Sequence, residues 1–307
     1  MMTKALIIST LLMISIATTY AQGCSDAGIC TIGNFNALHG ENPSAMYMHR
    51  QEIDISYTYA THLANERFSQ PQLNYRYINK QGAFYEFRLP FNMAMSKIPS
   101  ISTYGLGDMI ATYNNHIPNK NHLVLNYSLG LRVSFSNASR SENKSMFSYP
   151  MFLQSGLGTT DIIAVLNYDP FKYLSLGTGI QYPVIQYNTN ITNLTDRANM
   201  ITGIGFRRKP DALLKLTGHY PTGKFQFNLG ALSIFHLADD YYNTSLGKYS
   251  IQGSKGITLN WNAEINYSIN ERSGISFLYA EPLKTRSNIP DGLARSKVFN
   301  IKFTRKW

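Results

Sequence analysis

The chain has 307 residues, and its 28 Lys and Arg against 18 Asp and Glu give a formal net charge of +10. An excess of positive charge of this size indicates nucleic-acid binding mainly when the basic residues are clustered. Here the basic residues are spread along the chain. Together with the export signal described next, this argues against a nucleic-acid-binding protein. The mean hydropathy of −0.20 fits a soluble protein, but it also fits a membrane barrel, because half of each barrel strand is polar.

The first 21 residues have the features of a cleavable signal peptide. Lys4 provides the positive start, Ala5 to Ala17 is an apolar run, and Thr19-Tyr20-Ala21 places small residues before Gln22. The run is too short to span a bilayer as a helix. We therefore predict a signal peptide at 1–21, an N-terminal periplasmic or lumen-plugging segment at 22–49 and an outer-membrane barrel at 50–307.

Two cysteines, Cys24 and Cys30, follow the predicted cleavage site closely. In an exported chain this spacing predicts a small disulfide loop. Lipidation of Cys24 is the alternative, because Gly23-Cys24 resembles part of a lipobox. Two cysteines without a nearby pair of histidines do not form a zinc site, and the sequence predicts no metal site and no cofactor.

Strict alternation of apolar and polar residues dominates the rest of the chain. From Ile257 to Ile269 every odd position is apolar and every even position is polar. A strand places these two sets on opposite faces, whereas a helix would spread both around its circumference. Leu123–Phe135 and Phe225–Leu237 repeat the pattern. Such runs exceed the usual length of strands in soluble proteins and match the roughly 9–11 residues of a transmembrane strand.

Twelve strands are predicted, separated by gaps that alternate between short and long. The short gaps carry turn residues, as at Asn79 to Gly82, whereas the gaps 137–159 and 188–209 are long. Short turns at one end and long loops at the other are typical of outer-membrane barrels. An even strand number then places both termini at the periplasmic side. The predicted strands are 50–62, 70–79, 83–95, 107–115, 121–136, 160–168, 172–187, 210–220, 224–238, 256–269, 273–284 and 295–307.

The predicted fold is thus an all-β, transmembrane, antiparallel up-and-down barrel in the outer membrane of a Gram-negative-type cell. Fourteen strands are the alternative, because Met200 to Phe206 could supply another. The final strand places an apolar set on one face and ends on an aromatic residue, which resembles the signal recognised by barrel-assembly machinery. We expect that machinery, outer-membrane lipid and lipopolysaccharide as partners. The residues of the assembly signal are Phe299, Ile301, Phe303 and Trp307.

The alternation also predicts which polar side chains face the lumen. They would either line a path or pair with one another and close the barrel. The lumen-facing candidates are Glu86, Arg88, Arg132, Lys215, His219, His236 and Glu264.

Three Gly-rich motifs resemble a known group of barrels. They are Tyr104-Gly105-Leu106-Gly107-Asp108, the stretch Leu153 to Asp161 with Gln154, Gly156 and Gly158, and Pro290-Asp291-Gly292-Leu293. Over about residues 50–307 the chain resembles the MetA-type (phenol degradation) outer-membrane proteins, relatives of the FadL-type channels. The resemblance implies passage of small, often hydrophobic molecules and transfers no catalytic residues. It also implies that Cys24 to Met48 could plug the lumen, with a periplasmic tail as an equal alternative.

No motif predicts an enzyme. The glycine clusters lack the strand, helix and Lys-Ser/Thr of a phosphate loop, so bulges or close backbone approach explain them better. The His-x-Ser-Asn-Gly element of barrel phospholipases is absent from the sequence. The main hypothesis is a passive channel for small, hydrophobic or aromatic molecules of unknown identity. The alternatives are a structural or partner-binding barrel with a closed lumen and, last, a barrel lipid hydrolase.

Overall fold

The computed structural model describes residues 51–61, 66–97, 100–117, 124–142, 145–196, 199–292 and 296–307. The predicted signal peptide, the segment 22–49 and both cysteines lie outside the described residues. Within the described ranges, no helix is long and apolar enough to cross a membrane.

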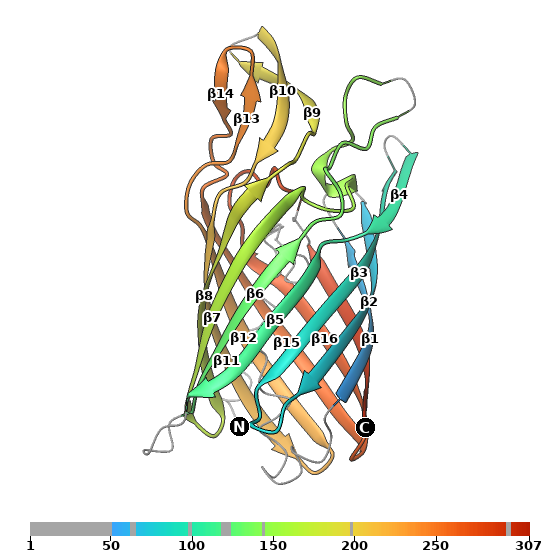
Figure 1. Ribbon diagram of the computed structural model, residues 1–307, viewed down its shortest axis with the longest axis vertical. Helices are drawn as coiled ribbons and strands as arrows, with labels where there is room; N and C mark the ends of the chain where they lie inside the picture. The colour runs from blue at the N-terminus through green and yellow to red at the C-terminus, as the bar shows by residue number, and fades with distance from the viewer. Residues whose placement is uncertain are drawn as a thin grey trace, which may run out of the picture.

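Twelve antiparallel strands close into one barrel, as predicted (Figure 1). Each strand pairs with its neighbours in chain order, β17 pairs with β1, and the β2–β3 pairing completes the ring. The all-β prediction and the count of twelve are confirmed. The strands are β1 (Gln51–Thr61), β2 (Arg67–Ile78), β3 (Phe84–Lys97), β5 (Met109–Ile117), β6 (Val124–Val133), β7 (Thr159–Phe171), β8 (Leu174–Gln186), β11 (Asp211–Thr222), β12 (Phe225–His236), β15 (Gly256–Asn270), β16 (Ser273–Lys284) and β17 (Lys297–Lys306).

Alternation along each strand separates a polar inner face from an apolar outer face. In β1, Asp54 and Thr58 are buried in the barrel, whereas Ile55 and Tyr57 are exposed on the outside. A strand directs successive side chains to opposite faces, so this arrangement follows from the sequence pattern. The outer surface is therefore a band of large apolar side chains, as a lipid environment requires.

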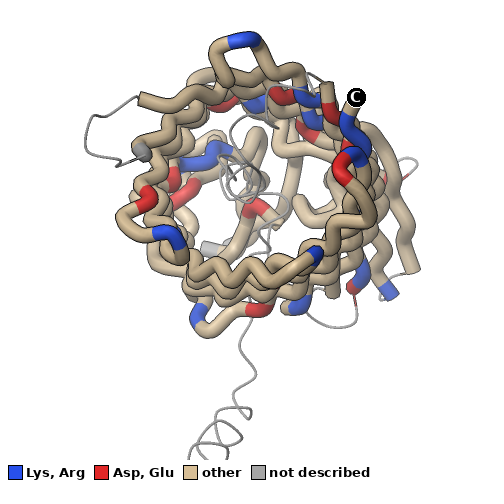
Figure 2. Tube along the Cα trace, turned by 90° about the horizontal axis from the view of Figure 1, so that it is seen from below, with Lys and Arg blue, Asp and Glu red and all other residues tan. Residues whose placement is uncertain are grey.

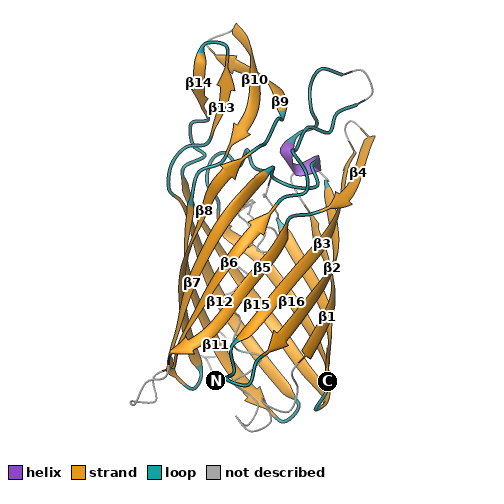
Figure 3. Ribbon diagram, in the orientation of Figure 1, coloured by secondary structure: helices purple, strands orange, loops and turns teal. Residues whose placement is uncertain are grey.

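The two ends of the barrel differ. At one end, which we call the turn end, neighbouring strands are joined by tight connections such as the one between β11 and β12, where Gly223 has a φ of 57°. At that end Gln51 and Trp307 exchange backbone hydrogen bonds, so β1 begins where the chain finishes. The opposite, loop end carries the long connections (Figure 3).

Five short strands lie beyond the barrel wall at the loop end. Strand β4 (Ser100–Leu106) extends the upper part of β3, and a separate four-stranded sheet contains β9 (Ile191–Asp196), β10 (Asn199–Arg207), β13 (Tyr241–Thr244) and β14 (Gly247–Ser250). The extra strand expected near Met200–Phe206 thus exists as β10. It pairs with β9 and β13 instead of entering the wall, so the fourteen-strand alternative is wrong.

Candidate functional site

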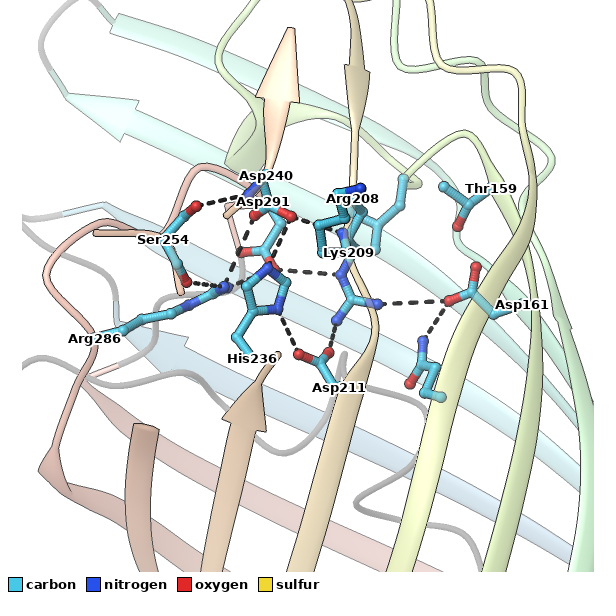
Figure 4. Close-up of polar contacts among 12 residues, drawn as sticks. Thr159, Asp161, Arg208, Lys209, Asp211, His236, Asp240, Ser254, Arg286 and Asp291 are labelled. Atoms are coloured by element: carbon cyan, nitrogen blue, oxygen red, sulfur yellow. Dashed lines mark hydrogen bonds and ion pairs between the residues drawn. The ribbon is translucent and has the colours of Figure 1, made fainter. Parts of the chain in front are cut away.

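A cluster of nine ionisable side chains lies at the loop end of the lumen, and we call it the loop-end cluster; Figure 4 shows the part of it around Arg208. Four members stand on strands that belong to the barrel wall, and five come from connecting segments. Most are fully buried. The members are Arg132, Asp161, Asp211 and His236 on the wall, and Asp108, Arg208, Asp240, Arg286 and Asp291 on the connections.

Arg208 is the centre of this cluster. Its guanidinium contacts Asp211, lies 3.4 Å from Asp291 Oδ2 and 3.6 Å from Asp161 Oδ2, and it is 0% exposed. Gln186 holds its backbone, accepting from the Arg208 N–H at 2.8 Å and donating to its carbonyl at 3.1 Å. A buried charge is tolerated only when it is paired, so Arg208 ties three segments of the chain together.

A second arginine anchors the connection between β16 and β17. Arg286 lies 2.7 Å from Asp291 and 3.8 Å from Asp240. Burial alone would raise the pKa of Asp291, but Arg286 and Arg208 overcome it and hold that pKa below its ordinary value. Burial raises the pKa of Asp240 above its ordinary value in spite of the nearby His236. The Asp291 carboxylate is therefore stabilised by its arginine partners, whereas desolvation destabilises the charged form of Asp240.

His236 and Arg132 connect the cluster to the wall. Both ring nitrogens of His236 face carboxylate oxygens, at 2.6 Å from Asp211 and 2.8 Å from Asp240, an arrangement that suits the doubly protonated ring. Arg132 lies 2.6 Å from Asp161 and 3.7 Å from Asp108. Positive and negative side chains thus alternate across the lumen with nearly balanced charge.

The three Gly-rich motifs meet beside this cluster. Asp108 accepts from the backbone N–H of Leu157, and Asn92 donates to the Ser155 carbonyl at 2.7 Å. A Cβ on Gly156 would collide with Asp108 and Ser134, and one on Gly292, which has a φ of 73°, would collide with the backbone of Met151 and Phe152. Close backbone approach therefore explains these glycines.

The other motif residues also hold this junction together. Gln154 donates to the carbonyls of Arg140 and Tyr149 and accepts from the Arg140 N–H. Gly158 has a φ of 68°, and Cβ atoms at Gly105 and Gly107 would crowd Ser155 and Asn92. The motifs therefore fold one loop over the barrel mouth and contain no group placed for covalent chemistry.

A cavity of about 50 Å³ adjoins the cluster on the β2–β3 side. Asp108, Arg88 and Arg132 supply charge, and Phe68 and Phe152 supply apolar surface. Its volume holds one or two water molecules rather than a larger ligand. The loop-end cluster and the surrounding loops thus leave little space at this end of the lumen.

The inner wall of β7, β8, β11 and β12 is layered. One row, read across the four strands, is Val165, Gly179, Leu213 and Ile234. Three residues of this row, Val165, Leu213 and Ile234, form one buried aliphatic cluster with Ile110, Ile163 and Leu232, which we call the aliphatic band. The row above belongs to the loop-end cluster, since Gln181 and His236 pair with Asp211 there.

The opposite wall carries the predicted inner residues Glu86 and Arg88. Arg88 Nε lies 2.6 Å from Glu86. Arg76 lies between two carboxylates, 3.5 Å from Glu86 and 2.8 Å from Glu52. All four side chains are buried on the inner face. These ion pairs, two of them between strands and one within β3, neutralise the charges along that wall.

The remaining predicted inner residues lie towards the turn end. Lys215 lies beside Gly177 on the inner face, while His219 and Glu264 belong to a relay. In that relay Ser175 contacts Asp169, His219 lies 3.0 Å from Ser175 and 2.9 Å from Asn228, and Asn228 donates to Glu264 at 2.9 Å. We call Asp169, Ser175, His219, Asn228 and Glu264 the turn-end relay.

The turn-end relay resembles a nucleophile beside a base, but its proton positions argue otherwise. A serine hydroxyl has one proton, and here it is donated to Asp169. The Nε2 of His219 must then donate to Ser175, so it cannot accept the proton that a nucleophile has to lose. Within the described ranges, no group of three or more His, Cys, Asp or Glu side chains is arranged to hold a metal ion.

The residues of the predicted assembly signal lie on the outer face. Phe299, Ile301, Phe303 and Trp307 are each exposed by between 42% and 49%, so they share one lipid-facing side of β17. Arg305 interrupts the apolar set and donates to Ser273 at 2.7 Å. Its position one residue from the strand end keeps the charge near the interface, where its cost is small.

Sequence reasoning missed four of the nine members of the loop-end cluster. Arg208, Asp211 and Arg286 were not among the predicted site residues, and neither was Asp240, which is 0% exposed. Connecting segments carry no periodicity, so alternation could not place them. The other five members had sequence signals: alternation for Arg132 and His236, and the Gly-rich motifs for Asp108, Asp161 and Asp291.

Comparisons with known proteins agree with this architecture. No protein-family model and no curated protein sequence matches the chain. An outer membrane channel from Pseudomonas putida F1 superposes with a TM-score of 0.61 at 11% identity, covering 84% of this chain and 96% of that one. The NanC porin superposes with a TM-score of 0.44 at 11% identity and covers 84% of this chain and 100% of its own. The KdgM porin superposes with a TM-score of 0.42 at 6% identity and covers 83% of this chain and 99% of its own. The fold defines an outer-membrane-type β-barrel.

Proposed function

We propose that this barrel is an outer-membrane channel for the passive passage of small molecules that carry an apolar part. The observation that supports this most is the aliphatic band on the inner wall, because a lumen face is otherwise polar. An amphipathic solute could place its apolar part against Leu213 and Ile234 and its polar part against the rows on either side. Hydrophobic or aromatic compounds, the substrates that the MetA-type and FadL-type resemblance implies, fit this description.

The proposal includes an orientation. The turn end and both chain termini would face the periplasm, and the loop end would face the exterior, since long loops are external in such barrels. The lipid-facing residues Phe299, Ile301, Phe303 and Trp307 would present the assembly signal to the barrel-assembly machinery during insertion. The expected location is the outer membrane of a Gram-negative-type cell.

A barrel with a permanently closed lumen is the second candidate, and the loop-end cluster favours it. Its buried ion pairs join connecting segments to the wall across the barrel mouth, centred on Arg208. In the channel hypothesis these pairs form a gate that opens. In the alternative they form a fixed plug, and the external loops bind a partner.

Reconstitution separates the two candidates. The full chain in planar bilayers should conduct, and proteoliposomes should admit benzoate faster than a polyol of similar size. Leu213→Asn should reduce that preference severalfold, because it places an amide in the aliphatic band. Thr217→Asn, four residues along the same face of β11, is the matched control and should preserve it. Absence of both conductance and uptake would reject the channel in favour of the closed barrel.

A further inference from the structure

Four exposed basic residues gather on the outer face at the loop end of one sector of the wall. Arg67 starts β2 and Lys297 starts β17, and each is paired with Thr61 at the end of the intervening β1. Residues paired directly across strands direct their side chains to the same face. Arg67 and Lys297 therefore flank Thr61 on the outer surface, about two strand spacings of 4.7–4.9 Å apart.

Lys97 and Arg140 continue this sector beyond β2. Arg67 pairs with Met95 of β3, and Lys97 is the next outward position on that strand. Arg140 lies over the exposed ring of Tyr104 at 5.7 Å and donates to the Tyr104 carbonyl at 2.6 Å, which fixes its guanidinium at the outer surface of β4. We call Arg67, Lys97, Arg140 and Lys297 the basic rim.

The strands β6, β7 and β8 differ from this sector of the wall. On β6, β7 and β8, the outward residues at the same end include Phe135, Ile162 and Ile185, which are large, apolar and exposed. The acidic side chains near the rim are Glu142, two residues after Arg140, Glu281, which accepts a hydrogen bond from Tyr279, and Glu66, which precedes Arg67. In the part of the chain that the structure describes, no rim residue forms an ion pair within 4.0 Å.

An apolar wall lies directly below the rim. Tyr57 and Phe299 continue the outer faces of β1 and β17 towards the turn end, and Phe91 stacks on Tyr104 at 6.4 Å. Aromatic residues at this depth mark the boundary between head groups and acyl chains. The basic rim therefore stands at head-group height, above a surface that suits acyl chains.

We propose that the basic rim binds the phosphate groups of lipid A, the anchor of lipopolysaccharide. Arginine matches a phosphate with two parallel N–H donors, and lysine adds a mobile point charge. A bisphosphorylated lipid with several acyl chains satisfies both the spread of the four cations and the apolar wall below them. The inference rests on the orientation proposed above, with the loop end facing the outer leaflet.

Binding of purified, bisphosphorylated lipid A to the full chain in neutral-lipid nanodiscs tests this proposal. Replacing the four rim residues together (Arg67→Gln, Lys97→Gln, Arg140→Gln and Lys297→Gln) should weaken binding by about tenfold or more, since each cation near an anionic surface contributes severalfold. The matched control removes four basic residues at the turn end (Lys80→Gln, Lys172→Gln, Lys224→Gln and Arg272→Gln) and should change binding less than about twofold. Lipid A without its phosphates should bind both variants and the parent alike.

Three results would overturn the proposal. The rim variant could bind lipid A as well as the parent does, or the turn-end control could lose as much lipid A binding as the rim variant. The third is that the rim variant loses as much affinity for phosphatidylglycerol, presented in nanodiscs, as for lipid A. A shift in gel migration on heating, which marks the unfolding of a folded barrel, reports whether each variant is intact. Conductance of the same preparations distinguishes the two proposals, because lipid A binds the outer face and does not require an open lumen. A closed barrel that binds lipid A through the rim would refute only the channel proposal and would leave the lipid A proposal standing.

Discussion

The two ends of the lumen use polar side chains in different ways. At the loop end, arginines and aspartates from connecting segments are buried to near zero exposure and pair across the barrel mouth. At the turn end, a chain of hydrogen bonds runs along the wall through Ser175, His219 and Asn228, and its histidine and asparagine remain partly exposed. The interior is seen from the turn end in Figure 2. The comparison shows that loops folding inward supply the partners with which the wall residues fill the barrel mouth.

Removing the centre of the loop-end cluster should have the largest effect. Arg208→Ala leaves Asp161, Asp211 and Asp291 with fewer partners and should destabilise the folded barrel by about 3–5 kcal/mol. It should also raise conductance if the cluster is a gate. Urea unfolding in detergent and single-channel recording measure the two effects. The neighbouring Lys209→Ala loses only a cation–π contact with Tyr241 and should cost less than about 1 kcal/mol.

Crowding the junction of the Gly-rich motifs should have an intermediate effect. The Cβ of Gly156→Ala meets the side chains of Asp108 and Ser134, so overpacking should cost about 1–3 kcal/mol. Gly218→Ala is the control, because its Cβ meets nothing closer than 3.8 Å. Equal stability of the two variants, measured by thermal unfolding, would show that the motifs do not need to approach closely.

Acid should weaken the loop end selectively. The folded pKa of Asp291 lies below its ordinary value of 3.8, so its contribution to stability is complete above that value and is lost as the pH falls towards the folded pKa. Hydrogen exchange at the amides of Gly292 and Asn288, which donate to the carbonyls of Ile289 and Gly253, should therefore accelerate when the pH falls from about 5 to 3, after correction for the intrinsic rate. Asp291→Asn should remove this dependence. A wild-type profile that stays flat would show that Asp291 does not hold the loop.

The smallest effect is expected at the turn end. Ser175→Ala removes one hydrogen-bonding hydroxyl and should cost about 0.5–1.5 kcal/mol, without a change in conductance. A fluorophosphonate probe should not label the wild-type protein, because the proton of Ser175 is donated to Asp169. Labelling that disappears in the variant would instead establish Ser175 as a nucleophile and revive the hydrolase hypothesis.

The lumen could be predicted only in part. Alternation placed Glu86, Arg88 and Arg132 on the inner face because strand residues have a fixed period of two. It could not assign their partners, since Arg132 meets Asp161 on a neighbouring strand and Asp108 on a connection. The aliphatic band was missed for a related reason. Val165, Leu213 and Ile234 look like ordinary members of apolar strands until the register aligns them.

The sequence by itself determined the barrel. Period-two alternation, strand length and the alternation of short and long gaps predicted the wall and its twelve strands, because each is a local property of the chain, and the pairing of β10 outside the wall then excluded fourteen. Only the tertiary structure decided what fills the mouth. Arg208 and Asp291 stand 83 positions apart in connections without periodicity, and they meet because a buried charge must find a partner wherever the folded chain brings one.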